Sequence, residues 1–275
     1  MIGIALANRL ASRGDEVTVI DNLFRGSFEG LSDKVKTVEG DAAQNIARQV
    51  GTDFDVIFHL AGMIFANECE KNPTFSNEAN TVTTLRVIEL AKQSGAKVVY
   101  ASSAAVYPSM NYAVRERETY ETPKTVYGLQ KLTSENYLQI SGVKYIALRL
   151  FNVFGSDKSE GVIEKFLRAK KEGKDFVVYG EGTARRDYVH IDDVVTAFVA
   201  AALHDKHGFS INIGSGTAYS VLDIIEMIDP FAHPVFVMPE QYDAACSLAD
   251  IMTAKLIFSF EPKKTVRQYI ESKLQ

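Results

Sequence analysis

The sequence has little of what marks several specialised classes of protein. Its 275 residues contain no tryptophan and two cysteines, Cys69 and Cys246, which are too few and too far apart for a disulfide framework or a CxxC metal site. No apolar run approaches the roughly 20 residues that span a membrane, and no basic stretch followed by an apolar core marks a signal peptide. We therefore expect a cytoplasmic protein with reduced thiols.

Basic residues are also not in excess, because 30 Lys and Arg stand against 35 Asp and Glu, for a formal net charge of −5. This balance argues against nucleic acid and against a membrane surface as partners. The histidines show no spacing typical of metal ligands, so we expect no metal site. The composition, with 46% hydrophobic and 24% charged residues, is that of an ordinary globular protein.

What the first half of the sequence does contain is an alternation of strand and helix signals. Helical stretches at residues 4–12 and 80–93 are each followed by a glycine, Gly14 or Gly95, of the kind that ends helices. Continuous apolar runs typical of strands buried on both faces lie at residues 17–20, 55–60, 97–101 and 144–149. The alternation predicts an α/β fold with a Rossmann-type, doubly wound parallel sheet.

The second half is less regular. Helices are predicted at residues 160–171 and 191–203, a strand at 176–179 and a loop at 180–186, and several prolines interrupt the remainder. We expect two parts: residues 1–155 form the main domain, with 187–213 returning to it, and residues 156–275 form a smaller C-terminal α/β region.

The beginning of the chain lacks an expected element. A dinucleotide-binding fold opens with a strand, a glycine-rich turn and a helix, whereas here the helix signal comes at once and Gly3 is the one glycine of that pattern. Without the first strand and the N–H groups of the turn, we expect either that the sequence starts late or that the protein binds its dinucleotide weakly.

The later half of this βαβ unit is present, and it ends at Asp21. A carboxylate at this position accepts hydrogen bonds from the adenosine ribose and repels a 2′-phosphate, which favours NAD over NADP. The alternative is that Asp21 and Asn22 form a solvated turn.

A YxxxK pattern occurs at Tyr120–Lys124, Tyr127–Lys131 and Tyr269–Lys273. Pro123 disfavours a helix at the first, and the third lies in the terminal residues, where we expect a frayed surface helix. Tyr127 and Lys131 open a helical run and share one face of it. They also follow Ser103, which ends a predicted strand, and open α/β sheets bind ligands at that end of their strands.

Chemistry supports the choice of the second pair. A free tyrosine has a pKa of about 10 and is a weak base at neutral pH, but the ammonium of Lys131 and a cationic nicotinamide ring both favour its phenolate. The Ser103 hydroxyl can hold the reacting oxygen in place. We predict Ser103, Tyr127 and Lys131 as catalytic residues; the alternative is a small strand-end residue and a partly buried aromatic ring.

Together with other segments, these residues resemble the extended short-chain dehydrogenase/reductase family, also called the NAD-dependent epimerase/dehydratase family, and within it the UDP-glucose 4-epimerase type. The similar segments are residues 102–107, 127–131, 149–155, 186–194 and 212–216. The similarity runs in order from Gly3 to about Ala254. It implies that the main domain binds NAD, that the C-terminal region binds a nucleotide sugar, and that a homodimer is common.

The resemblance also implies site residues. For the cofactor these are Gly3, Asp21, Asn22, Asp41, Ala42, Leu60, Ala61, Gly62, Asn80, Ser102, Tyr127, Lys131 and Phe151. For the substrate they are Ser103, Tyr127, Asn152, Val178 and Arg186. The guanidinium of Arg186 suits phosphate oxygens because it can donate two parallel hydrogen bonds; a salt bridge with Asp187 is the alternative.

The residues after Ser103 favour one reaction. Related dehydratases and decarboxylases have acidic residues there, and this chain has Ala104 and Ala105. The resemblance therefore implies NAD-dependent epimerisation at C4 of a nucleoside-diphosphate hexose through a 4-keto sugar. A reductase or decarboxylase of the same family, or a relative that binds ligands without turnover, remain alternatives. Glu240 stands where the family often has a phosphate-binding arginine, which we expect to weaken nucleotide-sugar binding.

Overall fold

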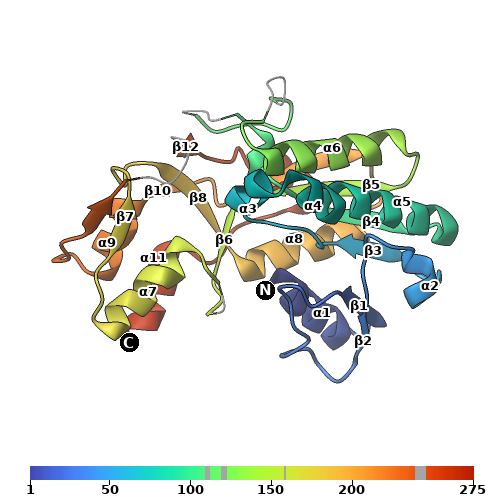
Figure 1. Ribbon diagram of the computed structural model, residues 1–275, viewed down its shortest axis with the longest axis horizontal. Helices are drawn as coiled ribbons and strands as arrows, with labels where there is room; N and C mark the ends of the chain where they lie inside the picture. Colours follow the sequence, from blue (N-terminus) through green and yellow to red (C-terminus); the bar gives the residue numbers. More distant parts are fainter. Residues whose placement is uncertain (109–111, 119–122, 158, 239–245) are drawn as a thin grey trace.

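The computed structural model describes residues 1–108, 112–118, 123–157, 159–238 and 246–275. Its centre is a parallel sheet (Figure 1) in which four strands lie side by side. In spatial order they are β3 (Val56–His59), β4 (Lys97–Ser103), β5 (Tyr145–Leu150) and β9 (Phe209–Ile213). These strands match the predicted apolar runs, except for β9, which the sequence pattern did not reveal.

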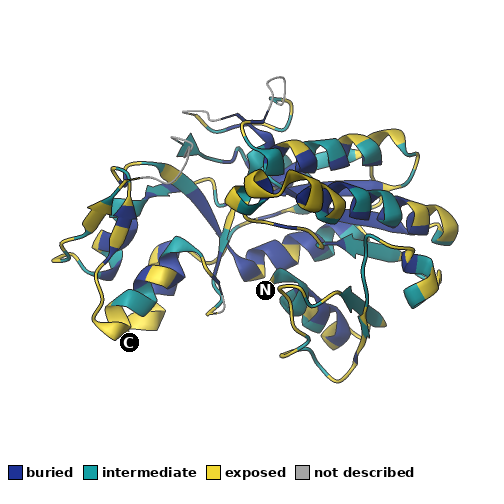
Figure 2. Cartoon of the chain, viewed as in Figure 1, coloured by how far each residue is buried: buried dark blue, intermediate teal, exposed yellow. Residues whose placement is uncertain are grey.

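Helices cover both faces of this sheet. Successive side chains of a strand point to opposite faces, so neighbouring residues of one strand pack against different helices. Val99 of β4 packs with α1 (Ile2–Arg13) and α8 (Ile191–Leu203). Tyr100, the next residue, packs with α5 (Thr83–Ser94) and α6 (Val126–Ile140) on the other face. The predicted Rossmann-type, doubly wound α/β fold is confirmed, and its sheet is buried on both sides (Figure 2).

The sheet is divided in two on one side. β1 (Val17–Asp21) pairs in parallel with β2 (Val35–Glu39), and within the described residues these two strands form a sheet of their own. No described strand lies between β1 and β3, the position at which an opening strand was found lacking in the sequence. α1 ends at Gly14, which takes the left-handed conformation at φ 93°.

A smaller region lies beyond the carboxyl ends of the main strands (Figure 1). Its strands are β6 (Asn152–Phe154), β7 (Val177–Tyr179), β8 (Arg185–His190), β10 (Ala218–Ser220), β11 (Val235–Val237) and β12 (Cys246–Ser247). Its helices are α7 (Val162–Glu172), α9 (Val221–Ile228) and α11 (Val266–Leu274), which enclose a separate apolar core. α10 (Met252–Phe258) returns to the main core through Ala254.

Short elements connect the main strands. They are α2 (Ile46–Val50), α3 (Ala66–Lys71), α4 (Pro73–Asn77), the π-helical turn η1 (Glu78–Val82) and the 3-10 turn η2 (Ala104–Val106). Within the described part of the chain, no helix is long and apolar enough to cross a membrane.

Two local predictions are wrong. The loop expected at 180–186 ends early, because Arg185 and Arg186 begin β8 and pair with β10. The helix that carries Tyr269 is not a frayed surface helix: the Tyr269 ring packs against Phe154 and His190 at centroid distances of 5.3 and 5.7 Å. In both cases tertiary packing supplies an order that the local sequence does not indicate.

The division of the sheet predicts unequal protection of backbone amides. β4 is paired on both sides, whereas β1 has one described neighbour, so β1 opens at a lower free-energy cost. We expect amides of 17–21 to exchange at least about tenfold faster than those of 98–101 in hydrogen–deuterium exchange read by mass spectrometry. Equal protection of the two strands would contradict this account.

Candidate active site

A cavity of about 1440 Å³ lies at the carboxyl ends of the main strands and extends to the smaller region. Pockets for a single small ligand usually measure about 300–1,000 Å³, so this space is large enough for two. Of the residues predicted for catalysis, cofactor or substrate, the lining includes Gly3, Asp21, Asn22, Asp41, Ala42, Leu60, Ala61, Gly62, Ser102, Ser103, Tyr127, Lys131, Phe151, Asn152 and Arg186.

Tyr127 and Lys131 come from the first turns of α6, whose start is fixed by local contacts. Thr125 caps the helix by accepting a hydrogen bond from the Gly128 N–H at 3.0 Å. A Cβ on Gly128 would lie 2.1 Å from the backbone oxygen of Ala105, so glycine allows the helix to approach the end of β4. Tyr127 therefore lies beside Ser103, whose side chain acts to lower the pKa of the phenol.

Lys131 lies one turn further along the helix and 3% of it is exposed. Its Nζ donates a hydrogen bond to the Ala101 carbonyl at 2.9 Å and lies 5.8 Å from the centre of the Tyr127 ring. The predicted catalytic residues are thus brought together around the carboxyl end of β4.

Burial disfavours the charged form of both titratable groups in this cluster, so it shifts their pKa values in opposite directions. It lowers the pKa of Lys131 to about 8, against a partial opposing effect from the nearby Cys69 and Glu135. It raises the pKa of Tyr127 to about 12, although the hydrogen bond with Ser103 pulls the value down. Tyr127 in this environment is a neutral phenol at pH 7, and a further positive charge is needed to make it a base.

The adenosine side of the proposed cofactor site is built from turns at strand ends. Asp21 ends β1, and its carboxylate accepts a hydrogen bond from the Leu23 N–H at 2.8 Å. Gly26 packs against the same carboxylate, since a Cβ there would lie 2.6 Å from Oδ2. Asp41 follows β2 and accepts from the Ala43 N–H at 2.9 Å. Both carboxylates thus line the cavity in rigid turns.

Asn80 does not line the cavity but lies directly behind Gly62. The Asn80 side chain is 1% exposed and donates to Gln130 Oε1 at 2.8 Å. Its Oδ1 is buried without a hydrogen-bond partner among the described residues. A Cβ on Gly62, whose φ is +151°, would lie 2.4 Å from this oxygen. Glycine at 62 therefore lets the Asn80 amide oxygen lie against the backbone of the cavity wall.

These features fit a dinucleotide at its two ends. Asp21 and Asp41 line the cavity where β1 and β2 end, whereas Tyr127, Lys131 and Phe151 line it near the ends of β4 and β5. Between them, the N-terminal residues 1–4 of the α1 segment line the cavity, and a helix N-terminus favours phosphate. The glycine-rich turn that normally adds further N–H groups is not part of the described cavity wall.

Of the residues predicted to bind the substrate, all but Val178 line the cavity. Val178 does not reach the cavity, because its side chain is 1% exposed in the core of the smaller region. Asn152 lines the cavity and donates to the Asp187 carbonyl at 3.1 Å. The buried carboxylate of Asp187 accepts hydrogen bonds from the N–H groups of Ser215, Gly216 and Ala249. Tyr120 and Glu240 lie outside the described residues.

Several residues near the cluster were not found from the sequence. Cys69, expected to be a reduced thiol, is fully buried beside Asn80, whose Nδ2 lies 3.9 Å from its Sγ. Glu70 accepts a hydrogen bond from the Val126 N–H at 2.7 Å, next to Tyr127. At the cavity mouth, the guanidinium of Arg25 pairs with Glu68 and lies 4.8 Å above the Phe65 ring. These contacts join segments that are distant in the sequence, so no local sequence pattern predicts them.

A doubly wound parallel sheet that holds Ser, Tyr and Lys at the carboxyl end of one strand, in one cavity with carboxylates at the ends of two others, is typical of a dinucleotide-dependent enzyme. A model of the NAD dependent epimerase/dehydratase family matches residues 1–214. The chain belongs to this family, whose cofactor is NAD.

Its relatives have more than one activity. UDP-glucose 4-epimerase of Mycolicibacterium smegmatis is 29% identical over 294 residues, covering 98% of this chain and 93% of that one. UDP-glucuronic acid decarboxylase 1 of Danio rerio is 25% identical over 295 residues, covering 100% and 69%. Among solved structures, a UDP-glucose 4-epimerase of Thermotoga maritima with UDP-glucose superimposes at a TM-score of 0.89 and 26% identity, covering 100% and 94%.

The lowered pKa of Lys131 predicts a pH-dependent stability. In the unfolded chain the lysine keeps its ordinary value of 10.5, so between about 8 and 10.5 the unfolded state binds more protons than the folded one. The free energy of unfolding should therefore rise by roughly 3 kcal/mol across this window in the wild type. The rise should be absent in Lys131→Met and present in Lys92→Met, a change at an exposed position of α5. Urea unfolding at pH 7, 8, 9 and 10 would show it; parallel curves for the wild type and Lys131→Met would contradict it.

Proposed function

We propose that the protein is an NAD-dependent 4-epimerase of nucleoside-diphosphate hexoses, of the UDP-glucose/UDP-galactose type. The observation that carries the proposal is the cluster of Ser103, Tyr127 and Lys131, which faces one cavity together with Asp21 and Arg186. Residues 1–155 with 187–213 would hold the cofactor, and residues 156–275 would hold the nucleotide sugar.

In this proposal each residue of the cluster has one task. Tyr127 removes the proton of the sugar 4-hydroxyl, and Ser103 holds the reacting oxygen by a hydrogen bond. Lys131 is largely protonated at pH 7, and its charge favours the Tyr127 phenolate. NAD⁺, when bound in this cavity, would supply the acceptor for the C4 hydride and the donor that restores it. Arg186 would bind the phosphates.

The surroundings of Ser103 support epimerisation over its alternatives. Ala104 and Ala105 line the cavity immediately after Ser103 and offer no acid or base for elimination or decarboxylation. A decarboxylase is the second candidate, because such an enzyme is among the relatives. A binding protein without turnover is the third, favoured by the gap between β1 and β3 at the cofactor site.

The proposal predicts that Tyr127→Phe abolishes turnover. Loss of the general base should lower kcat by about 10²- to 10⁴-fold, while the melting temperature stays near that of the wild type because the ring is kept. Tyr137→Phe, on the same helix and packed in the core beside α5, should keep full activity. Wild-type kcat in Tyr127→Phe would refute the assigned mechanism.

The reaction class can be read from products. With NAD present, we expect UDP-glucose and UDP-galactose to interconvert in a chromatographic assay, with no net rise in absorbance at 340 nm, because the cofactor is regenerated. We expect UDP-glucuronic acid to release no carbon dioxide, because the site has no additional acid. Decarboxylation would favour the second candidate. Failure to bind NAD or turn over any of these sugars would favour the third.

A further inference from the structure

Three side chains on one face of α6 contact three consecutive residues at the end of β4. Tyr127 lies beside Ser103, and Lys131 Nζ donates to the Ala101 carbonyl at 2.9 Å. The third is Glu135, whose Oε1 accepts a hydrogen bond from the Ser102 hydroxyl. Residues 127, 131 and 135 follow each other at intervals of one helical turn, so they form one row.

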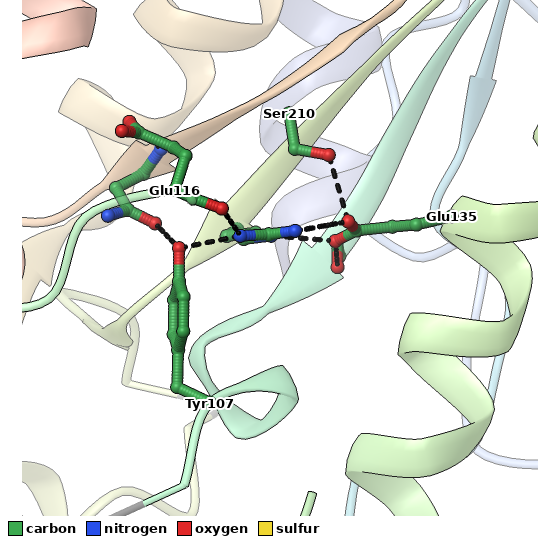
Figure 3. A network of polar contacts seen from close by, with 7 residues as sticks. Tyr107, Glu116, Glu135 and Ser210 are labelled. Atoms are coloured by element: carbon green, nitrogen blue, oxygen red, sulfur yellow. Dashed lines mark hydrogen bonds and ion pairs between the residues drawn. The ribbon is translucent and has the colours of Figure 1, made fainter. Parts of the chain in front are cut away.

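Glu135 is itself held firmly. Its side chain is buried and accepts from Arg149 through Nε at 3.0 Å and Nη2 at 2.7 Å (Figure 3). The Ser210 hydroxyl donates to Oε2 at 2.8 Å. The carboxylate is thus bonded to β4, β5 and β9 at once, and a fully satisfied buried network of this kind is rigid.

The network continues from Arg149 away from the helix. Arg149 Nη1 donates to the Tyr107 hydroxyl and to the Glu116 carbonyl, each at 2.8 Å. The Tyr107 hydroxyl donates to Asn212 Oδ1 at 2.6 Å, and the Asn212 N–H donates to Glu116 Oε1 at 3.0 Å. Figure 3 shows these contacts meeting between the strands and α6. Arg149 belongs to β5 and Asn212 to β9, so the network joins the anchor of the helix to the sheet and to the segment that carries Tyr107 and Glu116.

We propose that Glu135 is a positioning residue: by tethering α6 to Ser102, it fixes Tyr127 and Lys131 against Ser103. The inference rests on the proposed function, in which these residues perform the proton transfer. A displacement of a catalytic group by about 1 Å can cost about 100-fold in rate, and Glu135 supplies the contact that lies furthest along the helix from Tyr127.

Two serines allow a matched test, because each donates to the same carboxylate. Ser102 joins it to the strand that bears Ser103, whereas Ser210 joins it to β9 and does not line the cavity. Both Ser102→Ala and Ser210→Ala remove one hydrogen bond and should lower the melting temperature by similar amounts. We expect Ser102→Ala to lower kcat about tenfold with little change in KM, and Ser210→Ala to leave kcat within about twofold.

A second readout needs no substrate. Hydrogen–deuterium exchange of the amides of residues 126–135 should speed up in Ser102→Ala and remain at the wild-type rate in Ser210→Ala. If the wild type lacks epimerase activity but this difference is found, the proposed function fails and the tether stands. Equal behaviour of the two variants in exchange, or in kcat when the wild type is active, would overturn the inference.

Replacing the whole ion pair separates folding from positioning. Breaking a buried pair on one side leaves an unpaired charge, whereas replacing both partners by apolar residues of similar size often preserves the fold. In the double variant Glu135→Leu/Arg149→Met we expect a cooperative unfolding transition and a kcat reduced at least tenfold. Wild-type kcat in the folded double variant would show that the pair has no positioning role. Should the double variant not fold, the pair of serine variants decides the question.

Discussion

The close approach of α6 to the end of β4 is the constraint on which the site depends. It requires Gly128, because any side chain at this position would overlap the backbone of Ala105. With the helix this close, Tyr127 can bond to Ser103 and Lys131 can reach the Ala101 carbonyl. The pairing of β4 with β3 and β5, and the helices on both faces, hold the strand end against which this contact forms.

The close packing of α6 against β4 also shifts the pKa values of Tyr127 and Lys131. Packing the phenol and the ammonium out of water raises the pKa of Tyr127 to about 12 and lowers that of Lys131 to about 8. The protein alone therefore does not make Tyr127 a base at neutral pH. In the mechanism proposed above, the positive charge of NAD⁺ would favour the phenolate and would thereby couple proton removal to the bound cofactor.

The sequence revealed those parts of the fold that have a local signal. The apolar runs of β1, β3, β4 and β5 and the glycine after α1 indicated the sheet, and the spacing of Tyr127 and Lys131 indicated the cluster. β2 was missed because its sequence, VKTVE, is half polar and only Val35 is fully buried. Glu135 carried one signal, its position four residues after Lys131, but its partners Arg149 and Ser210 become neighbours only in the folded protein. Val178 was predicted to lie beside the substrate, and the structure buries its side chain in the core of the smaller region; the sequence does not show on which side of a short strand that core lies.

The gap between β1 and β3 has a consequence for how the protein is handled. Both strands border the cavity along their length, together with apolar side chains of α1 such as Leu6 and Leu10 and of α5 such as Val87. Open strand edges are templates for pairing with another chain, and among the described residues no strand pairs with the facing edges of β1 and β3, which border one space lined by apolar side chains. At high concentration, an extended segment of any unfolded neighbour can enter and pair there. Purification at low protein concentration opposes such pairing.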